Sequence, residues 1–124
     1  MHLTSILLPI LSLLATAQAG CYKREQSIGW GVEKTAAANE IGLAASPGRL
    51  AGFFNNGQEK TECHKLAENK AVHFKVKWLG EGGLTLRDGD CYTRLRNLVK
   101  QCDKGGEDTI SDWYFSADLR HGSC

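Results

Sequence analysis

The side chains best suited to acid–base chemistry are few, and no recognisable motif joins them. After residue 20 the histidines are His64, His73 and His121. A secreted ribonuclease of this size would combine a glutamate, an arginine and one or two histidines, for which Glu62, His64, His73 and Arg87 are available. No motif of the guanyl ribonucleases accompanies them. We therefore expect no enzyme and no catalytic residue, and a secreted ribonuclease-like enzyme is the alternative.

Metal-binding patterns are missing from the sequence. The chain has five cysteines, but none of them forms a Cys-x-x-Cys pair, and no two histidines have the spacing of zinc ligands. His64 beside Cys63 is a single pair of adjacent ligand types. The sequence therefore predicts no metal site and no cofactor.

Aromatic and polar side chains offer a second kind of chemistry, the binding of sugars. Aromatic rings can stack on sugar faces, while carboxylates and hydroxyls form hydrogen bonds with sugar hydroxyls. The candidate glycan-binding aromatic residues are Tyr22, Trp30, Tyr92, Trp113 and Tyr114. Because neighbours along a strand point to opposite faces, one of Trp113 and Tyr114 is expected in the core.

The first 19 residues predict a signal peptide. An apolar stretch over residues 3–14 is too short to span a bilayer with ease, and Ala17-Gln18-Ala19 has the small-x-small pattern of a cleavage site. We expect cleavage after Ala19. Residues 20–124 would then form a single secreted, extracellular domain with no membrane partner.

The charge of the chain is nearly balanced. Lysine and arginine number 15, aspartate and glutamate number 14, and the formal net charge is +1. This balance gives no general attraction to a phosphate backbone, so we expect no nucleic-acid partner.

Two helices are predicted to support these residues. Residues 32–45 are rich in alanine, with apolar side chains at helical spacing. In residues 88–102, Cys91, Leu95 and Leu98 recur on one helical face, and Asp88 or Asp90 can cap the start.

Four strands are predicted beside the helices. Residues 50–54 and 58–66 flank Asn55-Asn56-Gly57 and are expected to pair as a hairpin. Residues 71–79 alternate apolar and polar side chains, with Trp78 on the buried side, and residues 109–117 form the last strand. The expected fold class is α+β, a four-stranded antiparallel or mixed sheet with two packed helices, stapled by disulfides.

The five cysteines of a secreted chain are expected to form two disulfides. Cys91 and Cys102 lie about 16 Å apart along one helix and cannot bond to each other. We assume that the strand at 71–79 runs up, that the following helix runs down, and that the strand at 109–117 runs up again. In that case Cys63 and Cys102 lie at one end of the domain, whereas Cys91 and Cys124 lie at the other end. This favours Cys63–Cys102 and Cys91–Cys124, with Cys21 unpaired.

Several segments together form a family pattern. They are a cysteine just after the signal peptide, Gly52-Phe53-Phe54 through Cys63, the strand at 72–76, Asp90-Cys91 opening a helix that ends at Cys102, Gly105-Gly106, and the ending from Asp112-Trp113 to Cys124. With them the chain resembles a family of small secreted fungal proteins related to a mushroom glycan-binding lectin, many of which are regarded as candidate effectors. Ala36-Ala37-Ala38 stand where the pattern has a further cysteine, and Leu119-Arg120 replace its proline and asparagine. The resemblance implies a ligand loop that begins at Asp118, which is therefore a sixth candidate glycan-binding residue.

The sequence and the resemblance together predict a secreted fungal effector-like protein that acts by binding. Its expected partner is a glycan, or a protein of a host or competitor. The first alternative is a protein-targeting virulence effector without sugar binding. We expect a monomer, or a disulfide-linked dimer formed through Cys21.

Overall fold

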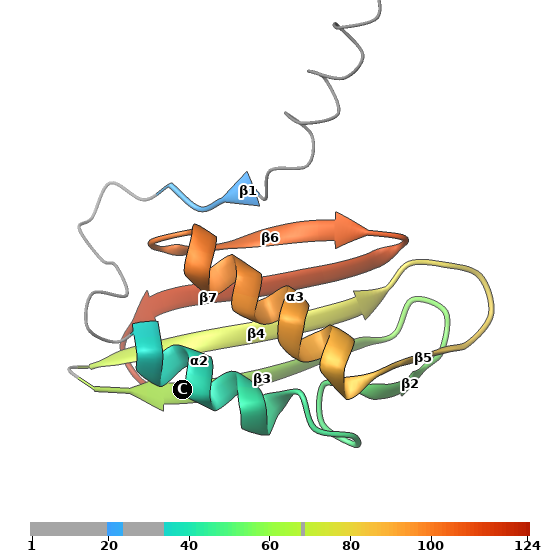
Figure 1. Cartoon of the computed structure of the whole chain (residues 1–124), viewed down its shortest axis with the longest axis horizontal. Coiled ribbons are helices and arrows are strands. Elements are labelled where there is room, and N and C mark those ends of the chain that lie inside the picture. The colour runs from blue at the N-terminus through green and yellow to red at the C-terminus, as the bar shows by residue number, and fades with distance from the viewer. Residues whose placement is uncertain (1–19, 24–33, 68) are drawn as a thin grey trace, which may run out of the picture.

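Two helices pack on one face of a five-stranded sheet (Figure 1). The computed structural model describes residues 20–23, 34–67 and 69–124, so the predicted signal peptide and Trp30 lie outside the described residues. The strands are β1 (Gly20–Cys21), β3 (Glu59–Leu66), β4 (Lys70–Trp78), β6 (Gly105–Ile110) and β7 (Trp113–His121). They lie in the order β1-β6-β7-β4-β3, and every neighbouring pair is antiparallel.

The helices are α2 (Lys34–Ala44) and α3 (Asp88–Gln101). A separate two-stranded sheet is formed by β2 (Gly52–Phe54) and β5 (Leu84–Leu86). Neither described helix has the length and apolar character needed to cross a bilayer. The structure confirms the α+β class with two helices and two disulfides, but the four-stranded sheet is replaced by sheets of five and two strands.

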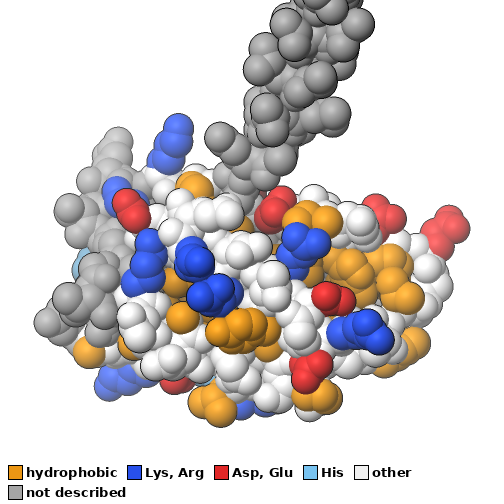
Figure 2. All heavy atoms as spheres, viewed as in Figure 1, with side chains coloured by type: hydrophobic (Ala, Val, Ile, Leu, Met, Phe, Trp, Pro, Cys, Tyr) orange, Lys and Arg blue, Asp and Glu red, His pale blue; other side chains and the backbone are white. Residues whose placement is uncertain are grey.

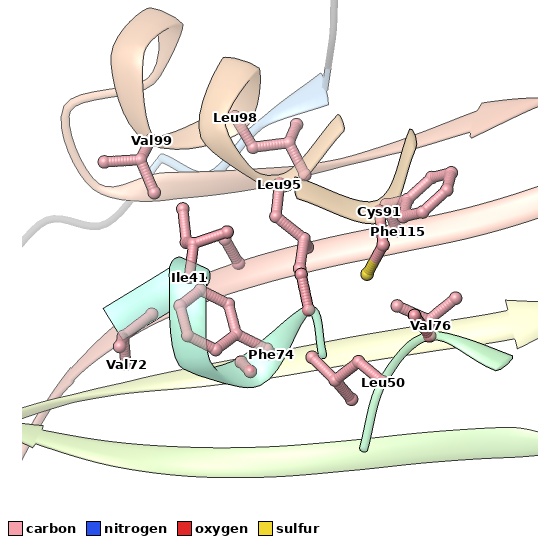
Figure 3. Close-up of a cluster of buried hydrophobic side chains, with 14 of the residues drawn as sticks. Ile41, Leu50, Val72, Phe74, Val76, Cys91, Leu95, Leu98, Val99 and Phe115 are labelled. Carbon is pink, nitrogen blue, oxygen red and sulfur yellow. The ribbon is translucent and has the colours of Figure 1, made fainter. Parts of the chain in front are cut away.

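The core lies between the helices and the sheet, as the alternation along β4 predicts. Val72, Phe74 and Val76 point to the helices and are buried. Leu95 and Leu98 of α3 meet them, as Figure 3 shows together with Ile41, Leu50, Cys91, Val99 and Phe115. Each fully buried side chain of this size contributes about 1.5–3 kcal/mol of transfer free energy. The predicted core is therefore confirmed.

The final predicted strand is a hairpin. Residues 109–117 were expected to run straight, but the chain reverses at Ser111 and Asp112, whose φ angles are 50° and 66°. Two successive residues with positive φ are the backbone of a tight hairpin turn, which usually has glycine or asparagine there. The expected single strand is thus divided between β6 and β7.

The hairpin expected at Asn55-Asn56-Gly57 has a different partner for its first strand. Gly57 has a φ of 76° and its N–H donates to the carbonyl of Trp78, so the chain does turn here. However, β2 pairs with β5 instead of β3, and Phe54 lies opposite Leu84. Burial of Phe54 in the core holds β2 away from the edge of the large sheet.

The disulfides are Cys21–Cys102 and Cys63–Cys124, so the predicted pairs Cys63–Cys102 and Cys91–Cys124 are wrong. The unforeseen reversal between β6 and β7 explains the error. It returns Cys124 to the end of the sheet where Cys63 and Cys102 lie. Pairing of β1 with β6 also brings Cys21 to that end, and Cys91 alone remains at the other.

The unpaired cysteine is therefore Cys91 and not Cys21. Its side chain is fully buried on the inner face of α3, and burial raises the pKa of the thiol to about 12. Such a thiol is inert as a nucleophile at neutral pH. Because Cys21 is already bonded to Cys102, it has no thiol for the expected disulfide-linked dimer.

Candidate functional site

The face of the sheet opposite the helices carries the polar side chains of alternating strand positions. Strand register places Thr61, Lys75, Ser116 and Glu107 in one row across four strands. The helix-bearing face, in contrast, shows charges of both signs, with a group of adjoining apolar side chains toward the right of Figure 2. We call the first surface the open face, because no described helix packs on it.

A cavity of about 580 Å³ lies on the open face. Its lining is Tyr22, Thr61, Glu62, Cys63, His73, Phe74, Lys75, Tyr114, Ser116, Asp118 and Arg120. Among its lining residues, Thr61 and Ser116 have short side chains, whereas Tyr22, Tyr114 and Arg120 have long ones. Its size lies within the range of ligand pockets for small molecules, about 300–1,000 Å³.

Two tyrosine hydroxyls converge at one side of the cavity. The hydroxyl of Tyr114 donates to Glu107 Oε1 at 2.6 Å, and that of Tyr22 lies 3.3 Å from the same oxygen. The Tyr22 hydroxyl is also hydrogen-bonded to the hydroxyl of Ser116 at 2.8 Å. The carboxylate of Glu107 therefore fixes both phenols, and a fixed hydroxyl can bind a ligand at a lower entropic cost.

Both phenols keep their protons over the physiological pH range. Burial raises the pKa of Tyr22, and the negative charge of Glu107 adds to this effect. Burial also raises the pKa of Tyr114 strongly, with a further increase from its hydrogen bond to Glu107. Neutral hydroxyls both donate and accept hydrogen bonds, as sugar hydroxyls also do.

The cavity also has charged side chains in its lining. Arg120 donates through Nε to Asp118 Oδ2 at 2.8 Å, and this hydrogen bond raises the pKa of the guanidinium further. Lys75 lies 4.0 Å from the carboxylate of Glu59. His73 Nε2 lies 3.6 Å from Sγ of Cys63, whose disulfide to Cys124 borders this end of the cavity.

The structure brings together three of the six candidate glycan-binding residues. Tyr22, Tyr114 and Asp118 all line the cavity. Trp113 points to the helix side, where its ring packs 4.6 Å from that of Trp78, so it is the core member of the Trp113–Tyr114 pair. Tyr92 is exposed on α3, outside the cavity.

The candidate ribonuclease residues do not form one site. His73 lines the cavity, but His64 is paired across the strands with Val72 and faces the helices. There His64 lies between two carboxylates, 3.0 Å from Glu40 and 2.7 Å from Glu62. Arg87 precedes α3 and does not line the cavity.

Glu62 belongs to an ion-pair network that joins β3 to the segment after α2. Burial alone would raise the pKa of Glu62, but the hydrogen bonds from Arg49 and His64 outweigh it and lower the pKa. Arg49 binds this carboxylate through two nitrogens, at 2.9 and 2.6 Å. The network therefore has a structural use that needs no substrate.

Residues that sequence reasoning missed form one row across the open face, and three of these four residues line the cavity. Thr61, Lys75, Ser116 and Glu107 are ordinary strand residues, and nothing in their local sequence marks them. Alternation along β4 does place Lys75 on the polar face. Only the strand order and register show that the four residues lie in one row.

No protein-family model matches the chain, and no curated protein matches it.

Proposed function

We propose that this chain is a non-enzymatic, secreted, fungal effector-like protein that acts by binding a carbohydrate. The observation that carries the proposal is the open-face cavity, where Tyr22, Tyr114 and Asp118 surround a volume of about 580 Å³. These residues come from β7 and from the segment after β1, far apart in the sequence. The resemblance to fungal proteins related to a mushroom glycan-binding lectin supports the same function.

The chemistry of the cavity suits a sugar ring. A sugar presents hydroxyls that donate and accept, together with an apolar face of C–H groups. The phenols of Tyr22 and Tyr114 offer neutral hydroxyls as well as aromatic rings, and Ser116 and Thr61 add further hydroxyls. Asp118 supplies an acceptor that Arg120 holds in place.

The ribonuclease alternative is less favoured by the same geometry. General acid–base catalysis needs its two groups within hydrogen-bond reach of one substrate. His64 and His73 point to opposite faces of the sheet, so they cannot act on one phosphodiester.

A glycan array with the disulfide-bonded protein tests the proposal, followed by titration of the strongest ligand. Tyr114→Phe removes the hydroxyl that Glu107 fixes, and Tyr92→Phe removes an exposed hydroxyl outside the cavity. We expect Tyr114→Phe to weaken binding about three- to tenfold, the effect of one lost hydrogen bond. Tyr92→Phe should leave the affinity unchanged.

Two other results would contradict the proposal. Failure of every glycan to bind would favour the alternative, a protein-targeting virulence effector without sugar binding. Cleavage of RNA that is lost in His73→Ala, at unchanged melting temperature, would favour the ribonuclease-like enzyme.

A further inference from the structure

Two acidic residues line the open-face cavity, and the carboxylate of each is already bound by a cation of this chain. The carboxylate of Glu62 points to the helix side of the sheet, where Arg49 and His64 bind it. Asp118 accepts from Nε of Arg120 at 2.8 Å. Neither carboxylate therefore needs a cation from a ligand, and neither strongly repels an anion.

One cation of the cavity is not neutralised to the same degree. Lys75 stands in the central row between Thr61 and Ser116, and its ammonium is 4.0 Å from Glu59, a residue outside the cavity lining. Both side chains of this pair are about two-fifths exposed, at 43% and 42%. An exposed pair at this distance contributes little, so the ammonium can turn to a ligand without a large loss.

Arg120 adds unused donors farther along the cavity, where it lies opposite Ala71 in the sheet. Its guanidinium contacts Asp118 through Nε alone, and no other described residue receives a hydrogen bond from its terminal nitrogens. A guanidinium has five N–H donors, which suit the oxygens of a carboxylate or sulfate. The imidazole of His73 lies between these two cations in the lining, opposite Asp118 in the sheet.

We infer that the saccharide bound in this cavity is anionic and carries a carboxylate or a sulfate. This inference rests on the proposed carbohydrate-binding function and specifies its ligand class. One acid group lies against Lys75, a second acid group of the same saccharide can lie against the terminal nitrogens of Arg120, and the hydroxyls of the ring lie against Tyr22, Tyr114 and Ser116.

A nucleic acid is the other polyanion that such a surface suggests, but it fits the charges less well. Binding to a phosphate backbone depends on several lysine or arginine contacts with successive phosphates. The cavity offers Lys75 and the partly engaged Arg120, and the chain as a whole has a net charge of +1. A short saccharide with one or two acid groups matches this number of cations.

Calorimetric titration of the disulfide-bonded protein with matched ligands tests the inference. The probes are tri-galacturonate, its methyl ester, and a sulfated disaccharide of chondroitin, with a short RNA and inorganic sulfate as comparison anions. We expect at least one of the two acidic saccharides to bind about tenfold or more tightly than the neutral ester, as a charge-assisted hydrogen bond implies. The two acidic probes distinguish a carboxylate ligand from a sulfate ligand.

A pair of lysine variants locates the effect. Lys75→Gln removes the ammonium in the cavity, whereas Lys65→Gln removes an exposed lysine of the neighbouring strand β3 that does not line it. We expect Lys75→Gln to weaken binding of the acidic saccharide about tenfold and to leave binding of the ester unchanged. Lys65→Gln should change neither affinity by more than about twofold, since exposed charges contribute little.

Several results would overturn the inference. Equal affinity for acid and ester, with binding still sensitive to Tyr114→Phe, would refute the anionic ligand and leave the carbohydrate function standing. Equal effects of the two lysine variants would also refute it, as would RNA or sulfate alone binding as tightly as the acidic saccharides. If no saccharide binds at all, the proposed function itself fails.

Discussion

Gly105, the first residue of β6, is a position where a single methyl group should break the fold beside the cavity. Its φ is 87°, and a Cβ built on it would lie 2.1 Å from the carbonyl oxygen of Ala117 in β7. Its own carbonyl accepts the backbone N–H of Tyr22 at 2.8 Å. Alanine at this position would therefore disturb the pairing of β6 with β7 and the placement of Tyr22.

The cost of Gly105→Ala has two parts. Left-handed backbone costs a residue with a side chain roughly 1–2 kcal/mol. The contact with Ala117 involves main chain on both sides, so one strand must shift, and overpacking of this kind costs about 1–3 kcal/mol. Together we expect a loss of about 2–5 kcal/mol in the free energy of unfolding, a large share of the 5–15 kcal/mol typical of a native protein.

Gly57→Ala is the matched control, because Gly57 has a φ of 76° but no atom within 4 Å of a built Cβ. It should lose only the part due to backbone strain, about 1–2 kcal/mol. Urea denaturation of both variants with intact disulfides measures the difference. Equal losses would show that β6 and β7 are not in the close register described, and that Tyr114 and Ser116 are not placed as the open face requires.

The remaining predictions concern the core, the disulfides and pH. Leu95→Ala should destabilise by about 2–5 kcal/mol in urea denaturation because Leu95 is fully buried between helix and sheet, and a change near zero would remove α3 from the core. Peptide mapping without reduction should recover Cys63 joined to Cys124, whereas a Cys91–Cys124 peptide would contradict the described disulfides. Replacing both Cys63 and Cys124 by serine should lower the free energy of unfolding by about 4 kcal/mol, the value for a loop of this length. The pKa of Glu62 is lower in the folded protein than its ordinary value of 4.5. The contribution of Glu62 to the free energy of unfolding is therefore complete above pH 4.5 and is lost as the pH falls through the folded pKa. Between about pH 5 and pH 3, the Glu62→Gln variant should therefore lose less of its free energy of unfolding than the parent protein does. Parallel plots of unfolding free energy against pH for the two proteins would contradict the ion-pair network of Glu62.

The sequence predicted the elements that local patterns determine. Alternation in residues 71–79 placed β4 and both of its faces, and apolar spacing placed α3 within one residue. Asp88 and Asp90 lie in the first turn of α3, but neither is its N-cap, which is Arg87. Such details depend on where the preceding chain enters the helix.

The errors have one main source, a turn without the usual residues. Ser111 and Asp112 adopt positive φ although neither is glycine or asparagine, so residues 109–117 read as one strand. That reading reversed the direction of β7 and with it the position of Cys124. Contacts distant in sequence, such as Phe54 in the core, decided the pairing of β2 with β5.

The candidate site could be predicted only in part for the same reason. Tyr22 and Tyr114 were identified by their chemistry, because tyrosine suits sugar hydroxyls, and Asp118 was identified by the family resemblance. Thr61 and Ser116 line the cavity with short side chains, and their position beside the tyrosines is a property of the assembled sheet. A short side chain indicates a cavity only when the register of the neighbouring strands is known.

Chemical-shift mapping by NMR, during titration with the strongest ligand of the glycan array, tests the location of the proposed binding site most directly. The account predicts that the largest shifts fall on the open face, at Thr61, Lys75, Tyr114 and Ser116, and that residues of α3 shift little. Shifts concentrated on α3 or on the β2–β5 sheet would contradict it, as would the absence of any shift at saturating ligand.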